Sequence, residues 1–285
     1  MNILVLSAAR ENGKTQALTM EAVNSIKLHL PGVTVKSLYL SEMQLPLCDG
    51  CGACLSSSEA NCPHYAAVSL ITDAIFWADG ILFASPVYAG MISSSMKNLL
   101  EHLFFMTHRP MLHGYHIFTL CVGASTGARE TAKYLKGIFG SYGADTVTCA
   151  SIADKGIGSE IMPKTMERVN ASAQDFADIV SMGPKHPSMR QLRNYNKLRA
   201  DIQIDNSDSY DSLWWEEEKM NDYPWVPGLP CARPALIYGQ FVYSRHKIAI
   251  RLSNAFLRME KQKRFKTAEK SQTAGGTPRR RKGKR

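Results

Sequence analysis

The feature that most constrains the fold is an alternation, over roughly the first 180 residues, of short apolar runs with segments of helical spacing. The apolar runs are residues 2–7, 33–40, 80–85, 115–123 and 144–151, and the helical patterns are residues 14–30, 65–78, 91–106, 126–142 and 160–181. Five such βα units predict a parallel sheet with helices on both faces. Because crossovers are right-handed, the carboxyl ends of the strands share one edge, where ligands of such folds bind.

The remainder of the chain has a different composition. Residues 183–234 are polar and contain Trp214, Trp215 and several prolines, so we expect a loosely packed extension whose aromatic side chains dock on the domain or on a partner chain. We predict three parts. They are a domain over 1–182 with a Cys-rich insert at 48–62, an extension over 183–259 with an amphipathic helix at 235–259, and a disordered basic tail over 260–285.

The net charge of +9 comes from the end of the chain. Residues 245–285 hold fifteen Lys and Arg against two Asp and Glu, or +13, so the rest carries −4. This run could make a weak contact with an anionic membrane, the alternative being a solvated tail. Nothing predicts a specific nucleic-acid module. No apolar run reaches the roughly 18–20 residues of a membrane span and no signal peptide is recognised, so we expect a cytoplasmic protein.

The loop after the first strand is rich in small, hydroxyl and basic residues and leads into a helix. Backbone N–H groups and the helix dipole make a helix N-terminus favourable for an anion. Because many donors converge here, a phosphate fits better than a carboxylate; the alternative is an ordinary capped turn with Asn12 as the N-cap. The loop matches neither the Walker A nor the dinucleotide glycine pattern. Its candidate residues are Ser7, Arg10, Asn12, Gly13, Lys14 and Thr15.

Two further loops suit a planar ring. After the third strand, Pro86 fixes the direction in which the chain leaves the sheet, and Tyr88 and Gly90 offer a flat side chain and an unobstructed backbone. Residues 123–127, which follow the fourth strand, are small and allow close approach of a ligand. Three loops of this kind on one edge favour a ligand site.

Four of the seven cysteines lie within fifteen residues: Cys48, Cys51, Cys54 and Cys62. In a cytosolic protein such clustering indicates a metal centre more than a disulfide framework. Gly50 and Gly52 allow tight turns between the thiols. Four thiolates at this spacing favour a [4Fe–4S] cluster, with zinc or redox-active thiols without metal as alternatives. Four histidines between residues 102 and 116 show no metal-binding spacing, and we expect them at the surface or at helix caps.

The pattern Ser-x-x-Arg-x-x-Gly-x-Thr, with Ser-Pro-Val-Tyr and a later Met-Lys, resembles the NAD(P)H-dependent FMN reductase family of the flavodoxin-like superfamily. The resemblance covers about residues 1–180 and implies the strand order 2-1-3-4-5. It implies that the first loop, Ser7, Arg10, Asn12, Gly13, Lys14 and Thr15, binds the FMN phosphate. It implies ring contacts from Pro86, Val87, Tyr88, Ala89 and Gly90, and from Gly123, Ser125, Thr126 and Gly127.

The cysteine spacing resembles that of iron-sulfur flavoproteins, which share this fold. Together the resemblances imply an FMN-dependent oxidoreductase that takes electrons from NAD(P)H or a reduced carrier protein and relays them between FMN and a [4Fe–4S] cluster. They also imply a dimer or tetramer. No catalytic acid or base is named, because the flavin carries the chemistry. The alternatives are an electron carrier or redox sensor without its own substrate, and a binding protein that has lost FMN.

Overall fold

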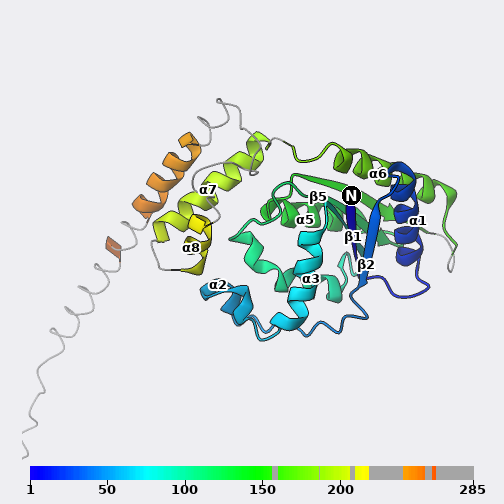
Figure 1. The fold of residues 1–285 in the computed structure, drawn as a ribbon, viewed down its shortest axis with the longest axis horizontal. Coiled ribbons are helices and arrows are strands. Elements are labelled where there is room, and N and C mark those ends of the chain that lie inside the picture. Colours follow the sequence, from blue (N-terminus) through cyan, green and yellow to red (C-terminus); the bar gives the residue numbers. More distant parts are fainter. Residues whose placement is uncertain (156–159, 186, 206–208, 218–239, 254–258, 261–285) are drawn as a thin grey trace, which may run out of the picture.

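In the computed structural model, a parallel sheet lies between two layers of helices (Figure 1). The structure describes residues 1–155, 160–185, 187–205, 209–217, 240–253 and 259–260. The strands are β1 (Asn2–Ser7), β2 (Thr34–Tyr39), β3 (Gly80–Tyr88), β4 (Met91–Ile92), β5 (His116–Gly123) and β6 (Thr146–Ala153). The parallel strands run in the order β2-β1-β3-β5-β6, and β4 pairs antiparallel with the end of β3. This confirms the predicted flavodoxin-like order.

Alternate side chains of the strands serve two cores. Ile3 and Val5 of β1 face α1 (Lys14–His29) and α6 (Pro163–Ser181), whereas Leu4 and Leu6 face the opposite layer. That layer contains α3 (Tyr65–Trp77), α4 (Ser94–His102) and α5 (Ala128–Ser141). Because side chains point alternately to the two faces of a strand, an unbroken apolar run fills both cores at once. Each fully buried side chain of this size contributes about 1.5–3 kcal/mol.

The third strand and the helix after it differ from the prediction. The strand continues to Tyr88, and Ala89 and Gly90, with φ of 50° and 79°, form a two-residue turn into β4. Positive φ at both central residues is typical of tight hairpins. The predicted helix at 91–106 is divided into β4, α4 and the 3₁₀ turn η2 (Phe104–Thr107). It starts late because the Ser93 hydroxyl accepts the N–H of Met96, which caps α4.

The C-terminal part contains two helices that the sequence analysis did not predict, α7 (Met189–Asp205) and α8 (Tyr210–Glu217). Trp215 of α8 is fully buried and its indole N–H donates to the carbonyl of His108 at 2.9 Å, so an aromatic side chain does dock on the domain. Residues 240–253 of the predicted amphipathic helix are helical. The Pro-rich stretch and the basic tail beyond residue 260 lie outside the described residues. None of the helices in the described part of the chain combines the length and the apolar composition of a membrane span.

Candidate cofactor site

The loop after β1 leads into α1, whose N-terminus has no side-chain cap. Ser7 is buried, and its hydroxyl accepts the N–H of Ala9 at 3.2 Å, which turns the chain as it leaves the sheet. Asn12 adopts a left-handed φ of 54° and its N–H donates to the Gln16 side chain, so it is not the N-cap. Gly13 is the N-cap and supplies no side-chain hydrogen bond. With no acidic residue in the first turn, the positive end of the α1 dipole is left available to an anion.

Lys14, the first residue of α1, is held by a carboxylate that the sequence analysis missed. Its ammonium lies 2.9 Å from Oδ1 of Asp154, whose side chain is completely buried, while Oδ2 of the same carboxylate accepts the N–H of Met162 at 3.1 Å. Asp154 directly follows β6, and its own N–H donates to the carbonyl of Gly123. The carboxylate therefore joins the first loop to the ends of β5 and β6 and offsets part of the positive charge at the start of α1.

The turn between β3 and β4 presents Tyr88 to solvent. Tyr88 pairs with Met91 across the hairpin, and its side chain is 57% exposed. The buried Ser85 hydroxyl donates to the carbonyl of Pro86 at 2.9 Å and accepts the N–H of Ser93 at 3.1 Å, which fixes the base of the hairpin. The turn is thus rigid where it meets the sheet and open at its tip.

The loop after β5 approaches the hairpin closely. Thr131 of α5 donates to the carbonyl of Gly90 at 3.2 Å. Gly127 has a φ of 86°, and a Cβ placed on it would meet the Cα of Gly90 at 2.6 Å. Only glycine allows this backbone-to-backbone contact. The two loops that were expected at a ring are therefore in direct contact.

The three loops and Asp154 surround a cavity of about 500 Å³ at the carboxyl edge of the sheet, a volume typical of small-ligand sites. The predicted residues that line it are Arg10, Asn12, Gly13, Lys14, Thr15, Pro86, Val87, Tyr88 and Gly123, joined by Val122, Ala124 and Asp154. Ser7, Ala89, Gly90, Ser125, Thr126 and Gly127 do not line it: Ser7 lies beneath the first loop, and the others lie in the hairpin turn and the loop after β5.

The cysteine segment is fastened to α4. Asn98 of α4 accepts the N–H of Cys48 at 2.9 Å and donates to the carbonyl of Pro46 at 2.8 Å. His102, one turn further along α4, bonds the same Pro46 carbonyl at 2.8 Å. Since α4 begins at the base of the β3–β4 hairpin, one helix connects the cavity loops to the cysteine segment.

Within the segment, Gly50 and Gly52 have φ of 64° and 71°, as expected for tight turns between thiols. Burial raises the pKa of the Cys54 thiol, and the neighbouring Cys62 and Cys48 raise it further, while Arg109 lowers it. These thiols are therefore close enough to interact electrostatically. In the described part of the chain, however, no three His, Cys, Asp or Glu side chains are arranged to hold a metal ion. The four thiols do not form a closed ligand set in this arrangement.

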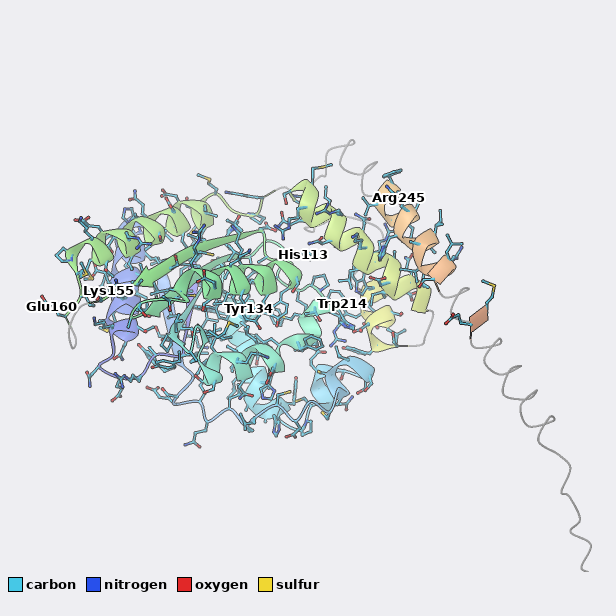
Figure 2. The ribbon with its side chains drawn as sticks, turned by 180° about the vertical axis from the view of Figure 1, so that it is seen from behind. His113, Tyr134, Lys155, Glu160, Trp214 and Arg245 are labelled. Carbon is cyan, nitrogen blue, oxygen red and sulfur yellow. The ribbon has the colours of Figure 1, made fainter. Side chains whose placement is uncertain are left out.

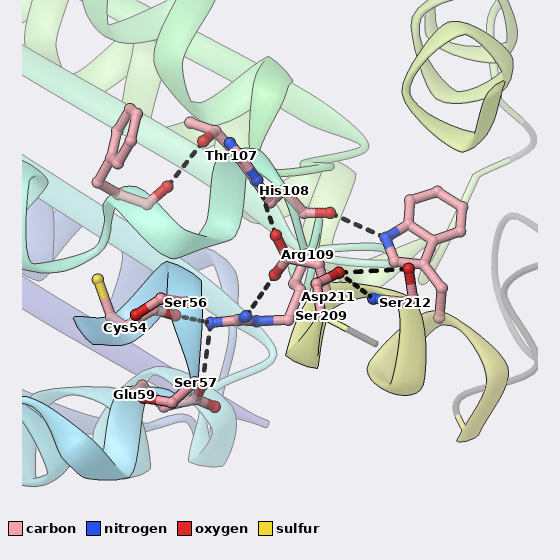
Figure 3. A network of polar contacts seen from close by, with 12 residues as sticks. Cys54, Ser56, Ser57, Glu59, Thr107, His108, Arg109, Ser209, Asp211 and Ser212 are labelled. Atoms are coloured by element: carbon pink, nitrogen blue, oxygen red, sulfur yellow. Dashed lines mark hydrogen bonds and ion pairs between the residues drawn. The ribbon is translucent and has the colours of Figure 1, made fainter. Parts of the chain in front are cut away.

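Arg109 joins this segment to the C-terminal extension (Figure 3). Its side chain is completely buried; one guanidinium nitrogen donates to Asp211 of α8 at 2.5 Å, and the other donates to the Cys54 carbonyl at 2.6 Å and to Glu59 at 3.0 Å. The turn η1 (Glu59–Asn61) and the helix α2 (Ala53–Ser56) carry these acceptors. His108 bonds the second oxygen of Asp211 at 2.8 Å. Because a guanidinium has a fixed fork of donors, one side chain fixes three segments.

Sequence reasoning missed Asp154, Asn98 and Arg109. Asp154 could have been found, because a lone acidic residue at the end of a strand lies on the ligand edge of such a fold. The histidine prediction was wrong for His102 and His116, which are buried, and the ring nitrogens of His113 are shielded from solvent. No local signal pairs Arg109 with Asp211, since 102 residues separate them.

Comparisons with known proteins agree with this geometry. A family model described as NADPH-dependent FMN reductase matches residues 1–157. An iron-sulfur flavoprotein of Archaeoglobus fulgidus is 25% identical over 212 residues, covering 70% of this chain and 94% of that protein. One from Methanocaldococcus jannaschii is 32% identical over 138 residues, covering 46% of this chain and 67% of that protein. A solved flavone reductase structure shares the fold, with a TM-score of 0.53, 12% identity, and coverage of 99% of this chain and 100% of that one.

Proposed function

Because this chain belongs to the NADPH-dependent FMN reductase family, we propose that it binds FMN in the cavity at the loop edge and oxidises NAD(P)H or a reduced carrier protein there. Its family is one of flavin-dependent NAD(P)H oxidoreductases. The observation that carries the proposal is the cavity itself, which has an uncapped helix N-terminus at one end and the Tyr88 hairpin at the other. When bound, FMN would supply the electron chemistry, and the protein supplies binding and orientation.

Each loop has a distinct task in this proposal. The first turn of α1 offers backbone N–H groups and the Thr15 hydroxyl to the phosphate, and the loop before it offers the Arg10 guanidinium, an arrangement that favours a dianion. The hairpin and the loop after β5 offer Val87, Tyr88 and Gly123 to a planar ring. Asp154 keeps the Lys14 ammonium at the inner wall of the cavity and lowers the net positive charge. The exposed position of Tyr88 leaves one side of the cavity open to a second substrate.

We further propose that Cys48, Cys51, Cys54 and Cys62 bind a [4Fe–4S] cluster. Electrons would be relayed between this cluster and FMN. This proposal is supported by the cysteine spacing, the left-handed glycines between the thiols, and two relatives whose names identify them as iron-sulfur flavoproteins. Since the thiols of the described residues are not closed into a ligand set, cluster loading would require this segment to rearrange. No step of the NAD(P)H reaction depends on it.

FMN titration of the purified protein tests the flavin site. We expect quenching of flavin fluorescence on binding, and an Arg10→Met variant with affinity lowered about tenfold or more, because a charge-assisted bond to a phosphate is lost. Arg190→Met is the matched control, since Arg190 is exposed at the start of α7 and does not line the cavity. Absence of quenching by the unaltered protein would contradict the proposal.

Steady-state oxidation of NADH and NADPH by the FMN-loaded protein separates the enzyme from its main alternative. A reducible flavin with negligible turnover of either nucleotide would indicate an electron carrier. The cluster is tested by iron and sulfide analysis of anaerobically purified protein, with Cys51→Ser and Cys121→Ser compared. Cys121 is buried in β5 and lies outside the cysteine segment, so only the Cys51 variant should lose iron. Iron-free protein would restrict the proposal to the flavin.

A further inference from the structure

The helical residues 240–253 lie beside α7 (Figures 1 and 2). The Tyr243 hydroxyl donates to the Gln203 side chain, and His246 Nε2 lies 3.1 Å from Asp201 Oδ1. The Arg199 guanidinium of α7 lies over the Tyr243 ring, 4.9 Å from its centroid. The named contacts between these two helices are therefore polar or involve an aromatic ring and a cation.

Three large apolar side chains of this helix lie on the side away from these contacts. Phe241, Ile248 and Leu252 are 57%, 59% and 66% exposed. Their spacing of seven and four residues places them on one face of an α-helix. The half-buried residues lie on the opposite side of the helix and are Val242, Tyr243, His246, Lys247 and Ile250. A helix at the surface of a globular protein normally turns its apolar stripe toward the core; here the stripe faces outward.

The surroundings of the stripe are strongly basic. Residues 240–253 contain Arg245, Lys247 and Arg251 and no Asp or Glu, and residues 245–285 together carry +13. The Arg245 guanidinium lies 5.7 Å from the centroid of the Phe241 ring, so a cation directly borders the stripe. The occupant of this face must therefore accept apolar side chains and supply negative charge.

Three kinds of occupant differ in how well they meet both requirements. A second copy of the chain would cover the stripe but would bring a second dense positive charge against the first. A nucleic acid would supply phosphates but little apolar surface along its backbone. An anionic lipid bilayer supplies both, because its headgroups attract Lys and Arg while the acyl boundary takes up apolar side chains.

We propose that residues 240–253 form an interfacial helix that holds the protein on an anionic membrane surface, with Phe241, Ile248 and Leu252 entering the headgroup boundary. The helix would lie in the plane of the interface, as expected for a short amphipathic segment. The polar contacts of Tyr243 and His246 hold the opposite side of this helix against α7, so the stripe faces away from α7 and toward the membrane. α7 would then be the next element of the protein behind the interfacial helix. This surface is independent of the proposed flavin chemistry.

Co-sedimentation of the full chain with vesicles tests the proposal. We expect binding to vesicles of phosphatidylcholine with phosphatidylglycerol, and at least about tenfold weaker binding to phosphatidylcholine alone. Replacing Phe241, Ile248 and Leu252 by serine should weaken binding to the anionic vesicles at least about tenfold. The matched control replaces Met20, Leu28 and Leu70, which are similarly exposed on α1 and α3, and should bind as the unaltered protein does. Circular dichroism and FMN titration verify that both variants fold.

Several results would overturn the proposal. Equal vesicle binding by the stripe variant and the unaltered protein would show that the basic tail acts alone. Failure to bind anionic vesicles, together with a fall in molecular mass of the stripe variant in sedimentation velocity, would identify a second copy as the occupant. Binding of a single-stranded oligonucleotide that is insensitive to the stripe, with no vesicle binding, would identify a nucleic-acid surface.

Discussion

The cavity at the loop edge and the buried cluster around Arg109 both gather polar groups, but they are assembled differently. The cavity is lined by the loop after β1, by the ends of β3 and β5, and by the residues that directly follow β5 and β6, so its parts are short segments at the ends of strands. The Arg109 cluster is built from single side chains that reach across the fold, with Asp211 and Glu59 separated from Arg109 by 102 and 50 residues. The first arrangement keeps a space open, and the second fills one.

This difference has an energetic consequence. A polar backbone around an open cavity remains solvated, so single side-chain changes there should alter ligand binding more than stability. A buried guanidinium has no water to replace a lost partner, so changes there should alter stability and the docking of α8. The comparison therefore predicts that variants of the two regions separate into binding and stability effects.

The largest effect is expected for Arg109→Met, which leaves Asp211 and Glu59 without their cation. Removing one partner of a buried ion pair costs about 3–5 kcal/mol of unfolding free energy. Urea denaturation measures the loss, and hydrogen exchange should rise first in α8. Asp211→Asn, which keeps the shape, should expose α8 in the same way. If FMN affinity falls in parallel with stability in these variants, the two regions are coupled and the comparison fails.

A smaller but still large effect is expected for Gly127→Ala, where the cavity loops touch. The new Cβ would meet Gly90 at 2.6 Å while adopting a φ of 86°, and strain together with overpacking should cost about 2–4 kcal/mol. Gly32→Ala is the matched control, since Gly32 has a φ of 78° with nothing within 4 Å of its Cβ, and should cost about 1 kcal/mol. Only the Gly127 variant should also lower the affinity for FMN. Equal losses in both variants would mean that the contact with Gly90 relaxes freely.

The same contrast explains how much the sequence could predict. The βα alternation and the three loops were readable because each signal lies within a few neighbouring residues, and the parallel sheet followed from the alternation. The strand order was implied by the family resemblance and not by these local signals. The helices α7 and α8 could not be predicted from the sequence, because their burial depends on partners such as His108 and His113 that lie far away in the chain. The hairpin at Ala89 was missed because a non-glycine residue adopts φ of 50° there. The roles of Asp154 and Arg109 could not be recognised locally, because their partners are brought next to them only by the fold.

A pH effect is expected at the junction between the domain and α7. Burial lowers the pKa of His113 from 6.5 to about 3, and its ring meets Tyr195 of α7 edge-on at 5.9 Å. The unfolded chain therefore binds a proton between these pH values that the folded protein does not. This difference predicts that the contribution of His113 to the free energy of unfolding is greatest above about pH 6.5. The free energy of unfolding should fall by about 2 kcal/mol between pH 7 and pH 5.

The variant His113→Gln should flatten this slope, measured by urea denaturation at each pH. Burial also lowers the pKa of His116, so a shallower dependence should remain in the variant. An unchanged slope in His113→Gln would assign the acid sensitivity to another group and leave the α7 junction without a titrating residue.

The smallest effect is expected for the exposed ion pair between Lys97 and Glu101, whose N–O distance equals that of the buried pair between Arg109 and Asp211. Lys97 and Glu101 of α4 lie 2.5 Å apart, as do Arg109 and Asp211, but the α4 side chains are each 47% exposed whereas Arg109 is fully buried. Water replaces the partner of an exposed charge, so Glu101→Gln should cost less than about 0.5 kcal/mol in urea denaturation. Comparison of the Glu101→Gln and Arg109→Met losses then contrasts one exposed ion pair with a buried cation that has several acceptors. A loss above about 1 kcal/mol for Glu101→Gln would show that α4, which links the cavity to the cysteine segment, depends on its surface charges as well as on its core.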